Sequence, residues 1–311
     1  MSGKPRILVL YYSQTGQLRH IIDNILLDVR EELEVTYAPI EPERPYPFPW
    51  NPDVFFDAMP ETVMHMPTSA TLPLPGPVMQ AEYDLVIFGH QPWFLNPSQP
   101  ITAFLQSPSA AVLKGKKVLT VIGARNMWLH AQERVKEQLL KQGAELVGNI
   151  ALVDNTPNII STLTVIRWAM KGQKEASRFL PAAGVQERDI QEAQQYGKPI
   201  LRHLREDTLA LLNDELLRMG AVNIKTGLVL LENTGIKNFR KWSKYIAAKG
   251  GPGAPERLGR VKQFKNLLIV AIFVLSPITS LIGKIREQVK MKKLKEDVAY
   301  FKQLKFEKGR I

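Results

Sequence analysis

The feature that most constrains the fold is a regular alternation of short apolar runs with segments of helical periodicity. The apolar runs are continuous, as in strands covered on both faces, and span residues 6–12, 34–40, 83–89, 117–123 and 145–153. Between them, apolar residues recur every three to four positions, which predicts amphipathic helices at 18–29, 100–106, 130–142, 158–170 and 197–219. The alternation predicts an α/β fold, a doubly wound parallel sheet with helices on both faces. Residues 221–231 are a further candidate strand.

A proline-rich segment, residues 39–79, separates the second predicted strand from the third. We call it the strap. Eleven of the 22 prolines lie in residues 39–77, together with the aromatic residues Tyr46, Phe48, Trp50, Phe55 and Phe56. Proline at this density argues against a regular helix, so we expect a long ordered loop. Such a loop either forms part of a binding site or simply packs across the edge of the sheet.

The turn after the first strand is a candidate phosphate site. It reads Ser13-Gln14-Thr15-Gly16-Gln17 and lies at the carboxyl edge of the predicted sheet, where doubly wound folds bind ligands. Hydroxyls, a glycine and the N-terminus of a helix favour phosphate binding there. The turn has no lysine, which excludes a triphosphate-binding loop. A simple helix cap is the competing interpretation.

Two later turns lie at the same edge and carry aromatic residues on which a flat ring could stack. They are residues 89–97 and 123–130. The segment from Tyr11 to Gln17 resembles the phosphate loop of flavodoxin-like proteins, and Pro92-Trp93 resembles their isoalloxazine loop. The match covers about residues 5–155 and implies the strand order 2-1-3-4-5 with flavin mononucleotide (FMN) as cofactor. Cofactor contacts beyond Ser13–Gln17 are then expected from Pro92, Trp93, Phe94, Asn96, Gly123, Ala124, Arg125 and Asn126, with Trp93 stacking on the ring.

A narrower resemblance is to the flavodoxin-like enzymes of bacterial dialkylresorcinol biosynthesis. It rests on Val9–Gln17, on Tyr46-Pro-Phe-Pro-Trp50 and on His90-Gln-Pro-Trp93. These proteins are often labelled condensing enzymes, but this chain has no cysteine to serve as the condensing nucleophile. The resemblance therefore implies an FMN-dependent oxidoreductase that aromatises an amphiphilic dialkyl cyclohexanedione to a dialkylresorcinol. A polyketide-type condensing enzyme of the same pathway is a candidate partner.

Histidines supply the candidate catalytic bases. The five histidines show no metal-ligand spacing, and we expect no metal site. His90 and His130 lie in the turns at the predicted cofactor edge, where a base would be useful, and a capping or packing role is the competing and more common explanation for each. Arg125 either offsets negative charge on a reduced flavin or is simply solvated.

Charge and apolarity divide the C-terminal part from the rest. Residues 237–311 hold 19 basic and 5 acidic residues, a net charge of +14 within a total of +11. Residues 267–283 are uncharged, and an apolar stripe, Met291, Leu294, Val298, Phe301 and Leu304, runs among the later lysines. Nucleic acid would explain the lysines but not the uncharged run, whereas anionic lipid explains both. We expect the uncharged run to dip into one leaflet, to span the membrane or to form a buried core helix. We expect the apolar stripe either to lie on lipid or to pair with another helix in a coiled coil.

These patterns predict three regions. Residues 1–155 would form the FMN-binding domain and 156–236 a helical extension that completes the domain or a substrate pocket. Residues 237–311 would form a membrane-associating tail that contains a flexible linker at 249–259 and the apolar segment 267–283. A chain ending near Lys249 would then still fold and bind flavin. Without an apolar signal region at the N-terminus, we expect the protein on the cytoplasmic side of the inner membrane, bound peripherally or monotopically. The alternatives are a quinone reductase or electron-transfer flavodoxin, and a non-catalytic membrane-anchored scaffold.

Overall fold

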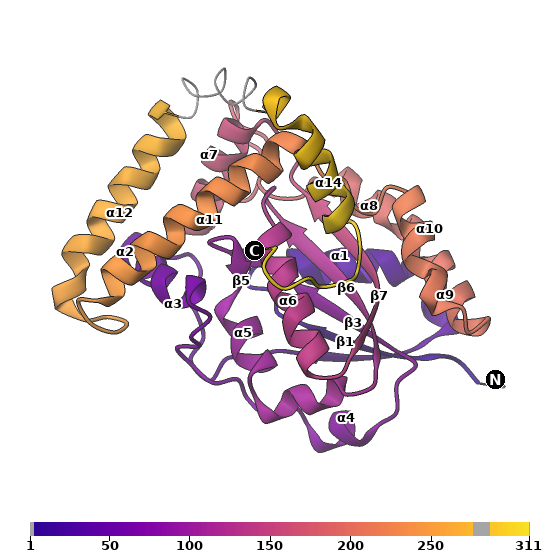
Figure 1. The fold of residues 1–311 in the computed structure, drawn as a ribbon. Coiled ribbons are helices and arrows are strands. Elements are labelled where there is room, and N and C mark those ends of the chain that lie inside the picture. Colours follow the sequence, from indigo (N-terminus) through magenta and orange to yellow (C-terminus); the bar gives the residue numbers. More distant parts are fainter. Residues whose placement is uncertain (1–2, 276–286, 311) are drawn as a thin grey trace.

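Five apolar segments form one parallel sheet in the computed structural model, which describes residues 3–275 and 287–310 (Figure 1). The strands are β1 (Arg6–Tyr11), β2 (Glu34–Pro39), β3 (Leu85–His90), β6 (Lys117–Ala124) and β7 (Glu145–Val153). Their order, β2-β1-β3-β6-β7, is the flavodoxin-like order 2-1-3-4-5. All four pairings are parallel, so the carboxyl ends of the five strands share one edge. The predicted doubly wound, flavodoxin-like fold is confirmed.

Helices cover both faces of the sheet. On one face lie α1 (Gln17–Leu26), η1 (Leu27–Glu32), α8 (Glu187–Glu192), η3 (Ala193–Tyr196), α9 (Gly197–Arg205), η4 (Leu209–Leu211) and α10 (Leu212–Arg218). On the other lie α5 (Gln99–Leu105), η2 (Pro108–Leu113) and α6 (Leu129–Lys141). Helix α1 packs so closely that a Cβ on Gly89 would lie 2.8 Å from the Cδ1 atom of Ile22. Glycine at this position therefore lets the first helix approach the sheet.

The strap contains short helices rather than only loop. They are α2 (Pro52–Asp57), α3 (Met59–Val63) and α4 (Gly76–Gln80), and each has a proline at its first or second position. Proline is tolerated there because the first N–H groups of a helix have no intrahelical partner. Our expectation that proline would prevent regular helix in the strap is therefore wrong.

The chain after β7 differs from the sequence-based expectations in two places. Helix α7 (Asn158–Lys171) is as expected, but the single helix expected at 197–219 is broken into α9, η4 and α10. The candidate strand at 221–231 is wrong, because α11 (Thr226–Ala247) begins there. Its buried residues recur at helical spacing over a length that a short apolar window could not reveal: Val229, Glu232, Ile236, Ser243 and Ile246.

The first part of the basic tail packs on the strap. Helix η5 (Pro255–Arg257) is followed by α12 (Leu258–Val270) and the π-helical turn η6 (Ala271–Leu275). The guanidinium of Arg257, which is 0% exposed, pairs with Asp57 and Glu61 at 2.6 Å each. Val261 and Phe264 of α12 belong to one core cluster with strap residues. The linker expected at 249–259 therefore contains a buried ion-pair network, and the expectation of a flexible linker is wrong.

The last helix packs on the sheet domain. Helix α14 (Met291–Phe301) buries Leu294, Tyr300 and Phe301 against the same core cluster as Ile122 and Trp128. The Tyr300 hydroxyl donates to Glu133 at 2.6 Å, and Lys136 of α6 donates to the carbonyl of Gln303 at 2.6 Å. The apolar stripe of this helix therefore faces protein, which corrects the expectation that the stripe lies on lipid.

The uncharged run 267–283 is described only in part. Residues 267–275 are helical, whereas 276–283 lie outside the described residues. Within the described part of the chain, no helix combines the length and apolarity needed to cross a membrane.

Candidate functional site

The turn between β1 and α1 lies at the carboxyl edge of the sheet and leaves open space beside Gly16. Gly16 adopts a left-handed conformation (φ 80°) at the N-cap of α1, and no atom lies within 4 Å of the position that a Cβ would take. The hydroxyl oxygen of Ser13 is buried and has no hydrogen-bond partner among the described residues. A buried hydroxyl without a partner is costly unless a ligand satisfies it. Together with the N–H groups that begin α1, the turn fits a bound phosphate.

The side chains of the two glutamines in this turn form hydrogen bonds with other segments of the chain. Gln14 donates to the carbonyl of Pro47 (3.2 Å) and accepts from the indole N–H of Trp50 (3.1 Å), which ties the strap to the turn. Gln17 exchanges two hydrogen bonds with the backbone of Val185, at 3.0 and 3.1 Å. Their side chains therefore hold neighbouring segments in place, and Ser13, Thr15 and the backbone remain as donors to an anion.

The turn after β3 is a strained miniature hairpin. Strands β4 (Pro92–Trp93) and β5 (Asn96–Pro97) are antiparallel and are joined by Phe94 (φ 47°) and Leu95 (φ 65°). Consecutive left-handed residues without glycine are costly and persist only where the surroundings hold them. Asn96 stabilises the hairpin by donating to the carbonyl of Phe94 at 2.7 Å.

Trp93 lies in a cluster of aromatic rings and is 9% exposed. Its ring contacts Tyr12, Tyr46 and Trp50 edge to face, with centroid distances of 6.0, 5.0 and 5.4 Å. The strap thus lies directly against the expected ring-stacking residue. Phe94 continues the cluster by packing on the strap residue Phe55 at 4.8 Å between centroids.

The turn after β6 is fixed to the N-terminus of α7. Arg125 donates to the side chains of Asn158 (2.7 Å) and Thr162 (2.9 Å), and Asn126 donates to Asn158 (2.8 Å). Burial lowers the pKa of Arg125, and the nearby carboxylate of Asp154 acts in the opposite direction. The alternative that Arg125 is simply solvated therefore does not describe its surroundings. Gly123 and Ala124 form the end of the strand beneath this turn.

His90 is wholly buried on the α5/α6 face of the sheet. Its Nε2 lies 2.9 Å from the amide oxygen of Gln132, whose amide nitrogen donates to Thr120 at 2.9 Å. Burial lowers the pKa of His90 to about 4, so the imidazole is neutral at pH 7. Its Nδ1 atom has no partner among the described residues. The catalytic role of His90 stays a prediction.

His130 lies at the start of α6, under helix α11. Its Nε2 is 2.9 Å from the side-chain oxygen of Asn233, and burial lowers its pKa to about 4. Its backbone N–H donates to Glu232 at 2.7 Å. The geometry gives His130 a packing role at the helix terminus, and its catalytic role also stays a prediction.

Sequence reasoning did not single out Glu232. This buried carboxylate caps α6 by accepting a hydrogen bond from the backbone N–H of His130 at 2.7 Å. Burial nevertheless raises its pKa to about 7. One feature of the sequence could have revealed it. Glu232 lies three residues after Val229 and four before Ile236, so a charged residue occupies the apolar face of a helix.

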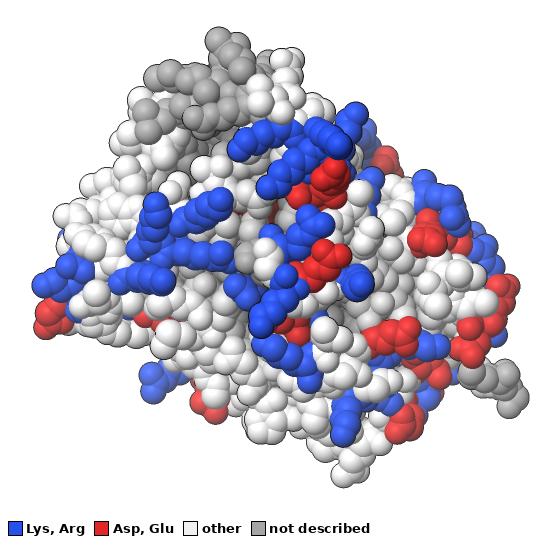
Figure 2. All heavy atoms as spheres, viewed as in Figure 1, with Lys and Arg blue, Asp and Glu red and all other residues white. Residues whose placement is uncertain are grey.

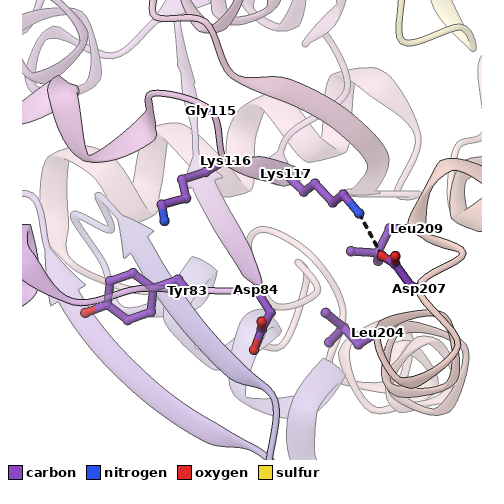
Figure 3. A pocket seen from close by; sticks show the side chains of 8 residues that line it. All are labelled: Tyr83, Asp84, Gly115, Lys116, Lys117, Leu204, Asp207 and Leu209. Carbon is purple, nitrogen blue, oxygen red and sulfur yellow. Dashed lines mark hydrogen bonds and ion pairs between the residues drawn. The ribbon is translucent and has the colours of Figure 1, made fainter. Parts of the chain in front are cut away.

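A cavity of about 210 Å³ lies at the opposite, amino-terminal edge of the sheet (Figure 3). It is lined by Tyr83, Asp84, Gly115, Lys116, Lys117, Leu204, Asp207 and Leu209. Lys117 pairs with Asp207 at 3.1 Å across it. This cavity shares no residue with the carboxyl-edge turns and is separate from the candidate phosphate site.

Comparison with known proteins finds no matching family model and no matching curated protein. Among solved structures, the chain is similar to a flavodoxin from the domain Archaea (12% identity, 64% of this chain and 99% of that chain, TM-score 0.33). A flavone reductase (11%, 65% and 63%, TM-score 0.35) and the Megasphaera elsdenii flavodoxin (17%, 49% and 88%, TM-score 0.30) are also similar. Because these likenesses are weak, the fold assignment rests on the strand order.

Proposed function

We propose that this protein is an FMN-dependent oxidoreductase that acts on an amphiphilic cyclic substrate at the cytoplasmic face of a membrane. The observation that carries the proposal is the unpartnered Ser13 hydroxyl, among the described residues, in the open turn before α1. That turn follows β1 and adjoins β3, the point where the strand order of the sheet reverses. Doubly wound folds bind their ligands at this switch point.

The turn before α1 has the groups that a phosphate of the cofactor would need. Ser13, Thr15 and the first N–H groups of α1 would hold the phosphate, because the positive end of the helix dipole favours an anion. Trp93 and Asn96 on one side and the turn 123–126 on the other would bound the flavin ring. When bound, the flavin supplies a hydride acceptor.

A dialkyl cyclohexanedione is the proposed substrate, and its conversion to a resorcinol removes two hydrogens. Support comes from the family resemblance, from the absence of a cysteine nucleophile and from the aromatic strap, whose residues Tyr46 and Trp50 pack on Trp93. The strap would form the wall for the alkyl chains. His90, neutral at pH 7 and with Nδ1 unpartnered among the described residues, is the proposed base; because it is wholly buried, this role requires the turn after β3 to open toward the substrate.

Anionic lipid is the proposed partner of the basic region 237–311, and a condensing enzyme of the same pathway is the proposed protein partner. Figure 2 shows Lys and Arg side chains crowded over α11 and α14, with fewer acidic side chains between them. Such a surface attracts anionic headgroups. Because the stripe of α14 is buried, the exposed lysines, and not the stripe, would make this contact.

Anaerobic mixing tests the reaction. The FMN-loaded protein is combined with a dialkyl cyclohexanedione, and the resorcinol product serves as the control because it has no hydride to give. We expect the dione, and not the control, to bleach the flavin and yield resorcinol. Reduction only by a nicotinamide or a protein donor would favour the electron-transfer alternative. Absence of flavin binding would favour the scaffold.

A further inference from the structure

Helix α7 buries polar side chains and exposes apolar ones, the reverse of an ordinary surface helix. Ser161, Thr162 and Thr164 are buried. The side chains on the outer face are 36–41% exposed: Ile159, Ile160, Leu163 and Ile166. Scattered exposed aliphatic residues need no explanation, but four on one face of one helix form a patch of the kind found at interaction sites.

The inward polar face is fixed by specific hydrogen bonds. The Ser161 hydroxyl donates to Asp154 at 2.6 Å, and the Thr162 hydroxyl accepts from Arg125 at 2.9 Å. Rotating α7 to bury its isoleucines would break both bonds and leave a buried carboxylate and guanidinium without these partners. The apolar face is therefore held outward by the sequence.

The segment that ends α7 is basic and carries a highly exposed aromatic ring. Residues 167–178 include Arg167, Lys171, Lys174 and Arg178 and one acidic residue, Glu175. Phe179 follows and is 85% exposed. An apolar helix face flanked by lysine, arginine and phenylalanine matches a helix that lies in the interface of an anionic bilayer. A protein partner would not by itself call for this excess of positive charge.

A second apolar surface lies at the same end of the molecule. The last turns of α12 and the turn η6 expose Leu267, Ile269, Val270 and Val274, each between 44% and 53%. In Figure 1 this end of α12 and helix α7 both lie at the upper end of the fold. Contact with a flat membrane at this end would therefore involve both surfaces.

We propose that the outer face of α7 lies in the headgroup region of an anionic membrane. This deepens the membrane association proposed above and requires no redox step. It adds a contact outside residues 237–311, to which the sequence alone assigned the anchor. Because the inner face of α7 binds Arg125, the contact would place the edge of the candidate flavin site beside the lipid, where an amphiphilic substrate enters.

A single fluorescent probe tests the contact. The chain has no cysteine, so Leu163→Cys accepts one environment-sensitive nitrobenzoxadiazole label. Leu140→Cys on α6, at a leucine that is 63% exposed, is the matched control. With vesicles of phosphatidylcholine and phosphatidylglycerol, we expect the probe at 163 to brighten severalfold, shift to the blue and be quenched by nitroxide-labelled lipid. The probe at 140 should not respond.

Equal responses at the two positions would overturn the proposal. A response at 163 that depends on protein concentration and not on vesicles would also overturn it, because a second copy would then cover the face. The variant Leu163→Ser with Ile166→Ser should partition onto the same vesicles about tenfold less than the wild type, because apolar area is lost from the contact. Unchanged partitioning contradicts the proposal. FMN binding by this variant should match the wild type, which separates this test from that of the flavin site.

Discussion

The Ser13 hydroxyl would have opposite effects on the stability of the cofactor-free protein and on the binding of FMN. Its buried hydroxyl has no partner among the described residues, which costs stability in the free state, whereas a phosphate would satisfy it. Ser13→Ala should therefore stabilise the cofactor-free protein by about 1 kcal/mol and weaken FMN binding about tenfold. Urea unfolding and flavin titration measure the two effects. A variant that is destabilised without FMN would show that the hydroxyl has a structural partner.

Glu232 should give the unfolding free energy a distinctive pH dependence. Burial raises the pKa of this carboxyl from 4.5 to about 7 in the folded protein. Because the pKa of Glu232 is higher in the folded than in the unfolded protein, the protonated carboxyl favours folding. This contribution to stability is fully present below the pKa of the unfolded state and is lost as pH rises through about 7. Glu232→Gln removes this titration. Between about pH 5 and about pH 8, the unfolding free energy of the variant should therefore rise relative to that of the wild type by up to about 3 kcal/mol.

The buried histidines do not obscure this comparison. Burial lowers the pKa of His65, His90 and His130 to about 4. Their contribution to the unfolding free energy is therefore lost as pH falls below about 6.5, whereas that of Glu232 is lost as pH rises. His65 and His90 titrate alike in both proteins and cancel in the difference, and His130, whose backbone N–H donates to Glu232, is neutral in both above about pH 6. Parallel stability curves for the variant and the wild type would contradict the raised pKa of Glu232.

Local chemistry was predictable for some site residues and not for others. The Ser13–Gly16 turn was visible because it directly follows a buried strand and needs only neighbours in sequence. The roles of Gln14 and Gln17 were not visible, since their partners, Pro47 and Val185, lie 33 and 168 residues away. The sequence likewise could not show that His90, at the end of β3, is enclosed, because its neighbour Gln132 comes from helix α6, 42 residues away.

At the scale of elements, the basic tail is the main correction to the sequence-based account. The composition of the tail suggested a separable anchor. Composition cannot predict, however, that Arg257 forms buried ion pairs with the strap residues Asp57 and Glu61. Likewise, the periodic stripe of α14 specifies an apolar face without specifying whether lipid or protein covers it. In the structure, the core cluster around Trp128 covers that face.

Truncation tests this correction. A chain ending at Lys249 loses α12 and α14, uncovers Met59 and Val63, and leaves Asp57 and Glu61 without Arg257. Removing one partner of a buried ion pair alone costs about 3–5 kcal/mol. We expect this chain to lose cooperative thermal unfolding or to aggregate, while a chain ending at Glu307 should unfold like the full protein. If the chain ending at Lys249 unfolds cooperatively and is as stable as the full protein, the tail is a separable region and this correction is wrong.

At the scale of the whole molecule, the sheet order was predictable because both the strand pattern and the family resemblance pointed to it. The way in which the rest of the chain surrounds the sheet was not predictable, since the strap, α7, α11 and the tail meet through contacts between distant segments. Those contacts place an aromatic cluster and a basic surface around one edge of the sheet. The central claim is that this edge binds FMN.

Titration of FMN against two glycine variants tests that claim most directly. Gly16 and Gly115 are both left-handed (φ 80° and 69°), and neither has an atom within 4 Å of the position that a Cβ would take, so aspartate strains both alike. Only Gly16→Asp places a negative charge beside the proposed phosphate. We predict that Gly16→Asp weakens FMN binding at least about a hundredfold and that Gly115→Asp leaves it unchanged. Equal affinity in the two variants would contradict the account.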